Sequence, residues 1–187
     1  MSREEALALV RQHLKKEHMF KHVLAVEAIM VSLAEHFGED KEKWSLVGIL
    51  HDIDYEKLDF SESESAKQHG VMAESMLVGK VSDEIIRCIK THNFENTGVM
   101  PQTKMEYALV AADAISGLIV ACALVMPSKK LSDVKVESVT RRYKEKDFAR
   151  NCNRERIYMC EKIGLDKVKF AEIALKALQN IADDLGL

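Results

Sequence analysis

The sequence predicts an all-α protein folded as a single domain. Glycine and proline are scarce, 8 and 2 among 187 residues, so few positions suit the tight turns that join short strands. Apolar residues recur at a spacing of about 3.6 throughout, whereas no strand-like alternation with hairpin turns appears. The chain is 47% hydrophobic and 30% charged, which is enough for one globular domain with a sizeable core. We therefore expect one domain over residues 1–187.

The N-terminal part of the chain predicts three helices. Ser2 and Glu5 have the spacing of a capping box, which marks the start of the first helix. Gly38 follows an apolar periodic stretch and is suited to the left-handed conformation that ends a helix. A polar, acidic segment (DIDYEKLDFSESES) then interrupts the periodicity and predicts a loop. The three helices are expected to run to about residue 16, over 18–37 and over about 40–51.

The rest of the chain also predicts helices and no second domain. Ser82 is a suitable N-cap. A loop through Gly98 and Pro101 leads to a long apolar helix, which Pro127 ends. No internal repeat or linker divides the chain. The expected helices cover about 65–78, 82–92 and 102–126, and further helices follow to residue 185.

The apolar stretch over 107–126 is about as long as a membrane span. Asp113 lies near its middle, and on insertion scales an acid there costs roughly 2.5–3.5 kcal/mol. The remaining residues are rich in Ala and Val and only modestly lipophilic. We therefore expect a buried core helix and no membrane partner. The buried acid on this helix then needs a partner or a metal.

Composition excludes several other classes of protein. A net charge of −3 and a pI near 6.2 argue against a nucleic-acid polymer as partner. The charged, amphipathic N-terminus lacks the apolar stretch of a signal peptide, so a cytoplasmic protein is expected. The cysteines form no C-x-x-C pair and are expected to be free thiols in a reducing compartment. They are Cys88, Cys122, Cys152 and Cys160.

The order His … His-Asp … Asp along the chain supplies candidate ligands for a metal ion. Two imidazoles and two carboxylates form a mixture that a hard or borderline divalent cation prefers. Two further histidines fall between the doublet and the last Asp, which is enough for two metal ions. Iron, manganese, cobalt and zinc are all compatible with such a site. The six candidate ligands are His22, His51, Asp52, His69, His92 and Asp113.

Each candidate also has an ordinary structural role. His22 alone suits a surface or satisfied core histidine, and Asp113 alone could bond a buried backbone group or an arginine. The joint pattern is stronger, because aliphatic residues frame both the doublet (VGILHDID) and Asp113 (LVAADAISGL). One cation satisfies two buried acids that would otherwise each need compensation. The remaining histidines, assigned to helix surfaces, are His13, His18 and His36.

Five segments resemble the HD superfamily of metal-dependent phosphohydrolases. They are KHVLAVEAIM, GILHDIDYE, QHGVMAESML, IIRCIKTHN and VAADAISGL. The resemblance covers about residues 18–126. The helical extension over about 127–187 resembles the tail of a group of predicted HD hydrolases from bacteria and archaea. The resemblance implies a helical HD-domain fold, with one metal held by His22, His51, Asp52 and Asp113. Family members with two extra histidines between the doublet and the last Asp bind a second metal, and the Asp of their doublet bridges the two metals. His69 and His92 match those histidines, and Asp52 matches the bridging Asp.

The chain departs from two branches of that superfamily. It lacks the GYP element of the cyclic dinucleotide phosphodiesterases, since THNFENTG follows His92. The 5'-nucleotidases carry a Glu where this chain has Tyr55, so Asp54 or Glu56 is expected to serve instead. The catalytic residues implied are thus His51, Asp52 and Asp54.

These observations predict a phosphohydrolase in which metal-activated water attacks the phosphorus of a small phosphorylated substrate, a nucleotide or related ester. Two alternatives stay open: a metal- or ligand-binding sensor without turnover, and a di-iron oxygenase on the same ligand plan. The C-terminal helix (VKFAEIALKALQNIADDL) could serve the core or a homodimer contact.

A basic segment supplies candidates for substrate binding. Residues 129–156 carry ten Lys or Arg against five acids in a chain whose net charge is −3. Lys129 and Lys130 directly follow the long apolar helix and are expected near the mouth of the site. We expect one of these lysines, together with Arg141 or Arg142, to contact substrate phosphate.

Overall fold

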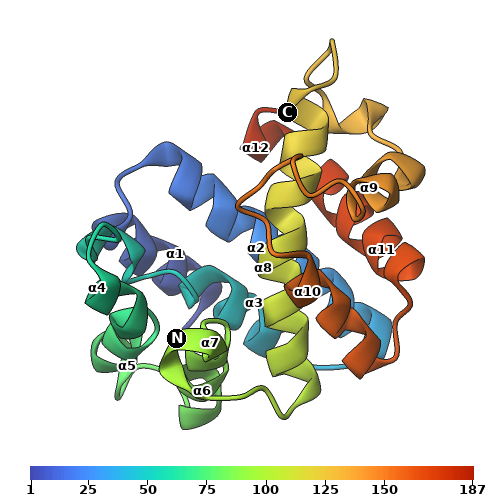
Figure 1. The fold of residues 1–187 in the computed structure, drawn as a ribbon. Coiled ribbons are helices and arrows are strands. Elements are labelled where there is room, and N and C mark those ends of the chain that lie inside the picture. The colour runs from blue at the N-terminus through green and yellow to red at the C-terminus, as the bar shows by residue number, and fades with distance from the viewer.

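The computed structural model describes residues 1–187, apart from the side chain of Ser63, and every regular element in that part is a helix (Figure 1). The predicted all-α single domain is confirmed. The α-helices before the basic segment are α1 (Arg3–His13), α2 (Glu17–Phe37), α3 (Lys41–Leu50), α4 (Ser63–Gln68), α5 (Val71–Leu77), α6 (Asp83–Thr91), α7 (Phe94–Thr97) and α8 (Lys104–Leu124). The α-helices that follow α8 are α9 (Val136–Arg142), α10 (Arg154–Ile157), α11 (Lys167–Asn180) and α12 (Ala182–Leu185). Short 3-10 helices are η1 (Tyr55–Lys57), η2 (Leu131–Asp133) and η3 (Tyr158–Ile163).

The expected helix boundaries in the N-terminal part are largely confirmed. Ser2 and Glu5 form the predicted capping box, in which each side chain binds the other residue's backbone N–H. Gly38 ends α2 in the left-handed region, with φ 67°. The side chain of Asp40 accepts a hydrogen bond from the Lys43 N–H at the start of α3. α1 is shorter than predicted, since it ends at His13 rather than near residue 16.

The single helix predicted over 65–78 is wrong, because the chain forms α4 and α5 there. Gly70 separates the two helices with φ 87°, a conformation that disfavours other residues. A Cβ at this position would also lie 3.4 Å from the Lys90 Cα on α6. The break leaves His69 in an extended conformation at the end of α4, where its side chain is buried rather than on a helix surface.

α8 runs through the centre of the molecule (Figure 1). It is the one helix among the described residues that is long and apolar enough to cross a membrane by length and composition, with a mean hydropathy of 2.0 in its most apolar window. In this structure 67% of that window is buried inside the protein. Residues such as Leu109, Ile115 and Leu118 are fully buried. The expected core helix is confirmed.

α2 and α3 pack at unusually short range, which positions the His-Asp doublet. A Cβ at Gly48 on α3 would lie 2.6 Å from the Glu27 Cα on α2, closer than any side chain allows. Glycine therefore lets the two backbones touch. The close approach holds the C-terminal end of α3, which carries His51 and Asp52, against the part of α2 that carries His22.

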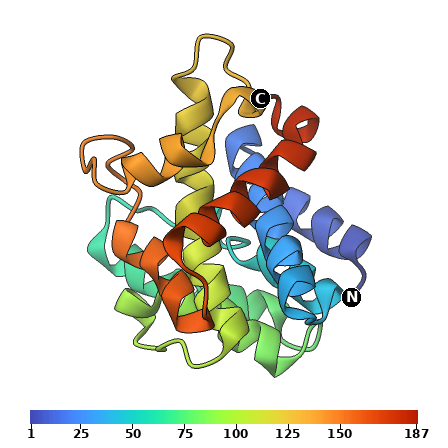
Figure 2. The ribbon, with the colours of Figure 1, turned by 90° about the vertical axis from the view of Figure 1, so that its right-hand side faces the viewer.

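The chain after α8 turns back and covers one side of the core. α11 packs on α2, α8 and α9, while α10 and η3 pack along α8 (Figure 2). Leu131, Val139 and Phe170 contribute buried side chains to the same core as the first two thirds of the chain. This path places α10 and the loop before it beside the middle of α8. The four cysteines of the chain are free thiols, as predicted.

Candidate metal centre

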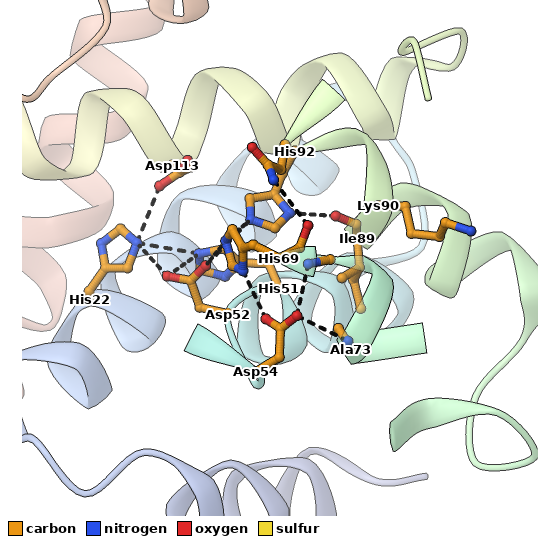
Figure 3. A network of polar contacts seen from close by, with 12 residues as sticks. His22, His51, Asp52, Asp54, His69, Ala73, Ile89, Lys90, His92 and Asp113 are labelled. Carbon is orange, nitrogen blue, oxygen red and sulfur yellow. Dashed lines mark hydrogen bonds and ion pairs between the residues drawn. The ribbon is translucent and has the colours of Figure 1, made fainter. Parts of the chain in front are cut away.

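The six predicted ligands converge on one point of the fold (Figure 3). They come from separate elements, so tertiary packing alone brings them together. His22 lies on α2, and Asp113 lies midway along α8. The other four lie where helices end: His51 and Asp52 directly after α3, His69 after α4, and His92 after α6.

Asp52 stands between two pairs of histidines. Its Oδ2 lies 3.5 Å from the Nε2 of His22 and 3.4 Å from that of His51. Its Oδ1 lies 3.2 Å from the Nε2 of His69 and 3.4 Å from that of His92. The carboxylate is almost completely buried. Each of its two oxygens therefore faces a different pair of imidazoles.

The remaining distances complete two groups of ligand atoms. The Nε2 atoms of His22 and His51 are 3.3 Å apart, and Asp113 Oδ1 lies 3.2 Å from His22 Nε2. On the other side of Asp52, the Nε2 atoms of His69 and His92 are 2.8 Å apart. Within each group, the ligand atoms lie within 4.8 Å of one another. The groups are His22, His51 and Asp113, and Asp52, His69 and His92.

Two of the histidines are oriented by the helices that they end. The last carbonyl groups of an α-helix have no partner within the helix. His51 Nδ1 donates to such a carbonyl, that of Gly48, at 2.8 Å. His92 Nδ1 donates in the same way to the carbonyl of Ile89. Since a carbonyl can only accept, both rings carry their proton on Nδ1 and direct Nε2 toward the centre.

The other two histidines are oriented by side chains. Asp54 Oδ1 accepts from His69 Nδ1 at 2.9 Å. Ser116 donates its hydroxyl proton to the Asp113 carbonyl and lies 3.3 Å from His22 Nδ1, which donates to it. All four imidazoles thus use Nδ1 for anchoring and present Nε2 to the centre. Such anchoring is the usual way in which proteins orient histidines that bind metals.

Asp54 has a different place from the one expected for a catalytic residue. Its side chain is fully buried behind His69, and its Oδ2 accepts from the backbone N–H groups of Gly70 and Ala73 at 2.8 and 3.0 Å. The carboxylate therefore faces the start of α5 and not the open side of the centre (Figure 3). Glu56 also lies elsewhere, because it accepts from the N–H groups of Lys15 and Lys16. Sequence reasoning missed the positioning role of Asp54, although its spacing from the doublet was visible.

The electrostatics of the centre favour positive charge between its carboxylates. Burial lowers the pKa of His51, but the Asp52 carboxylate outweighs it and raises that pKa to about 9. Burial likewise opposes protonation of His69, yet hydrogen bonds to Asp52 and Asp54 raise its pKa to about 10. Burial raises the pKa of Asp113, but the hydrogen bond with His22 outweighs burial and lowers that pKa to about 2. A bound divalent cation would replace the protons on these imidazoles.

The spacing of the donor atoms fits such a cation. Two donors that each lie about 2.1 Å from one ion, at about 90–110° to each other, are about 3.0–3.4 Å apart. The distances here run from 2.8 Å, between His69 and His92, to 3.5 Å, between His22 and Asp52. The mixture of imidazole and carboxylate suits iron, manganese, cobalt or zinc. The clusters can therefore hold divalent metal.

The four basic residues expected at the substrate lie away from the centre. Asp113 is eleven residues before the end of α8, about 16 Å along its axis, and Lys129 and Lys130 follow that end. Arg141 and Arg142 lie on and at the end of α9, where both pair with Glu145. The expectation that these four residues lie near the mouth of the site is therefore wrong.

Another residue of the basic segment does reach the centre. Arg156, on α10, lies 3.4 Å from Asp113 Oδ2 and forms a two-pronged ion pair with Glu95 at 2.9 and 2.5 Å. Its side chain is 18% exposed, so the pair is partly shielded from water. The turn of the chain after α9 brings Arg156 here, and periodicity carries no signal for that turn.

A pocket of about 440 Å³ opens over the centre. His18, which was assigned to a helix surface, is exposed and also lines this pocket. Tyr55 lines it too, with a phenol whose pKa is raised by burial and by Asp52. Cys152 lies in an adjoining pocket, but burial raises its pKa to about 11 and its thiol donates to the Ala114 carbonyl. A protonated thiol is a poor nucleophile.

The helical fold and the buried histidine–aspartate clusters define an all-α protein with a site that can hold divalent metal. The profile of the family described as HD domain matches residues 19–118, and the chain belongs to that family. Over 52 residues it is 40% identical to the symmetrical bis(5'-nucleosyl)-tetraphosphatase of Halalkalibacterium halodurans. That match spans 28% of this chain and 27% of the relative. No solved structure matches the chain.

Proposed function

We propose that the protein hydrolyses a nucleotide or a related phosphate ester with two divalent metal ions and water as the nucleophile. One ion would be held by His22, His51, Asp52 and Asp113, and the other by Asp52, His69 and His92. The observation that carries this proposal is the place of Asp52, whose two oxygens face different histidine pairs at 3.2–3.5 Å. A carboxylate in that position is suited to bridge two cations.

Metal ions in such a site acidify water, hold a phosphoryl group and stabilise the leaving oxygen. The chain itself contributes orientation and charge. The Nδ1 anchors keep four imidazoles in place, which lowers the cost of ordering them at each turnover. Arg156 places a guanidinium at the edge of the centre, where substrate phosphate would arrive. Cys152 stays protonated, which supports water rather than a thiolate as the nucleophile.

Similarity to the tetraphosphatase supports a nucleotide or polyphosphate substrate. That relative is named for acting on a dinucleoside tetraphosphate, and the guanidinium groups of Arg150 and Arg156 near Asp113 suit an anionic ligand. Because the match spans 27% of the relative, the substrate is part of the proposal.

The test combines anaerobic purification, metal analysis and a panel of phosphate esters and anhydrides assayed with Mn, Co, Ni and Fe(II). We expect metal-dependent release of phosphate or nucleotide. Hydrolysis without oxygen argues against the oxygenase alternative. Binding of metal without turnover of any panel member would favour the sensor and overturn the proposal.

Two variants assign the activity to the centre. His51→Ala and Asp52→Ala should each abolish activity and strongly reduce bound metal, because each removes a ligand and leaves buried groups unpaired. His36→Ala is the matched control, since His36 is exposed at the end of α2. Retained activity in either centre variant would refute the site.

A further inference from the structure

We infer that the leaving group of the substrate occupies a second pocket, beside Asp113, and that this leaving group is polar and carries a further phosphate. The inference rests on the proposed function and extends it to the class of substrate. The pocket measures about 700 Å³ and lies between α8 and the chain before α10. Its walls include Glu95, Asn96, Ala149, Arg150, Asn151, Cys152 and Asn153.

The second pocket is continuous with the metal centre. His22, Asp113 and Arg156 line both it and the 440 Å³ pocket over the centre. A phosphoryl group held at the centre therefore has this space next to it, on the Asp113 side. The other group of ligands, Asp52, His69 and His92, lines the 440 Å³ pocket and not the second pocket. This asymmetry points the leaving group toward the C-terminal extension.

Gly117 forms part of the floor of this pocket. It lies four residues after Asp113 on α8, so both residues share one face of the helix. It is exposed, and a Cβ built there meets no atom within 4 Å among the described residues. Neither a close helix contact nor a positive φ requires glycine here, and glycine weakens a helix. The absence of a side chain instead keeps the space beside Asp113 open.

The walls present arginines and amides, together with two carboxylates, Glu95 and Asp113, that both pair with Arg156. Arg156 is at the border with the centre, and Arg150 lies on the loop that leads into α10. Among the residues that the structure describes, Arg150 pairs only with Asp147, at 3.5 Å. Both side chains are exposed, so this ion pair is weak and easily exchanged for phosphate. The amides of Asn96, Asn151 and Asn153 can both donate and accept. Such a lining suits a phosphate-bearing leaving group better than an apolar one.

The experiment compares two probes on the metal-loaded protein. Inorganic tripolyphosphate has a pyrophosphate leaving group, whereas the leaving group of p-nitrophenyl phosphate carries no phosphate. Arg150→Ala should lower kcat/KM for tripolyphosphate about tenfold and change that for p-nitrophenyl phosphate less than about threefold. Gly117→Leu, which fills the floor, should likewise reduce tripolyphosphate turnover about tenfold with bound metal unchanged. Arg141→Ala is the matched control, because Arg141 pairs with Glu145 away from the pocket, and it should behave like the wild type.

Equal losses for both probes, or no loss for tripolyphosphate, would overturn the inference. If the wild type hydrolyses neither probe, the ester panel still tests the proposed function, and binding tests the pocket separately. Calorimetric titration of the metal-loaded protein with tripolyphosphate should show binding that Arg150→Ala weakens about tenfold. Equal affinity of the wild type and Arg150→Ala, or no binding by either, would exclude the pocket as a phosphate site.

Discussion

Asp54 Oδ1 lies 2.9 Å from His69 Nδ1, so a carboxylate with no access to the open side of the centre determines how one of its histidines points. The other carboxylate oxygen is held by two backbone N–H groups at the start of α5. The Asp54–His69 pair therefore links the break between α4 and α5 to the orientation of a metal ligand.

Asp54→Asn should weaken metal binding on the His69 side while the protein stays folded. The amide oxygen can replace the oxygen that faces Gly70 and Ala73, which leaves the NH₂ group opposite His69 Nδ1. Two donors cannot bond, so His69 must move its proton to Nε2 and cease to be a ligand. We expect affinity for the ion on the His69 side to fall about 10–100-fold, as measured by metal titration. Wild-type affinity would contradict the positioning role.

The two halves of the centre should lose metal separately. His92→Ala removes a ligand facing Asp52 Oδ1, and His22→Ala removes one facing Oδ2. Each variant should keep metal in the other half, whereas Asp52→Ala should lose both ions, because Asp52 faces both histidine pairs. Metal analysis after desalting gives the stoichiometry. Equal stoichiometry in His92→Ala and wild type would argue for a single ion on the His22 side.

Arg156→Ala should lower kcat/KM for a phosphate ester by about tenfold or more, because it removes the guanidinium 3.4 Å from Asp113. Lys130→Glu is the matched comparison, since Lys130 lies beyond the far end of α8. Its KM should not change. A raised KM in Lys130→Glu with normal metal content would restore the original expectation for that lysine.

Two glycines in helices should respond to alanine in opposite ways. Gly48→Ala places a Cβ 2.6 Å from the Glu27 Cα, so α2 and α3 must separate. We expect a loss of about 1–3 kcal/mol of stability, with weaker metal binding because His51 moves from His22. Gly117→Ala meets open space and should gain about 0.5–1 kcal/mol. Denaturant unfolding measures both, and a neutral Gly48→Ala would show that the helices can adjust.

Removal of metal should lower the thermal stability of the protein and abolish its activity. A ligand present at about 100 times its Kd stabilises the folded state by about 2.7 kcal/mol, which for this size of protein is about 5–10 °C in Tm. Thermal scans with and without a chelator test this, and re-addition of Mn or Fe(II) should restore both properties. An unchanged Tm, with metal shown to be released, would mean that bound metal adds little to the stability of the folded protein.

The helical fold could be predicted because its signals are local. Ser2 with Glu5, Gly38 and Ser82 mark helix ends through side-chain or backbone conformations that act over a few residues. The break at Gly70 was missed, because neither the positive φ of that residue nor its contact with Lys90 on another helix is visible in the spacing of apolar residues. Local patterns contain no information about such contacts.

The sequence by itself determined the all-α fold and the six side chains that meet, since buried acids and histidines within apolar segments need a common partner. Only the tertiary structure decided what surrounds them. The path of the chain after α8 brought Arg156 rather than Lys130 to Asp113. The packing of α5 turned Asp54 into the support of His69. Both outcomes depend on contacts between segments far apart in the chain, which residue spacing does not encode.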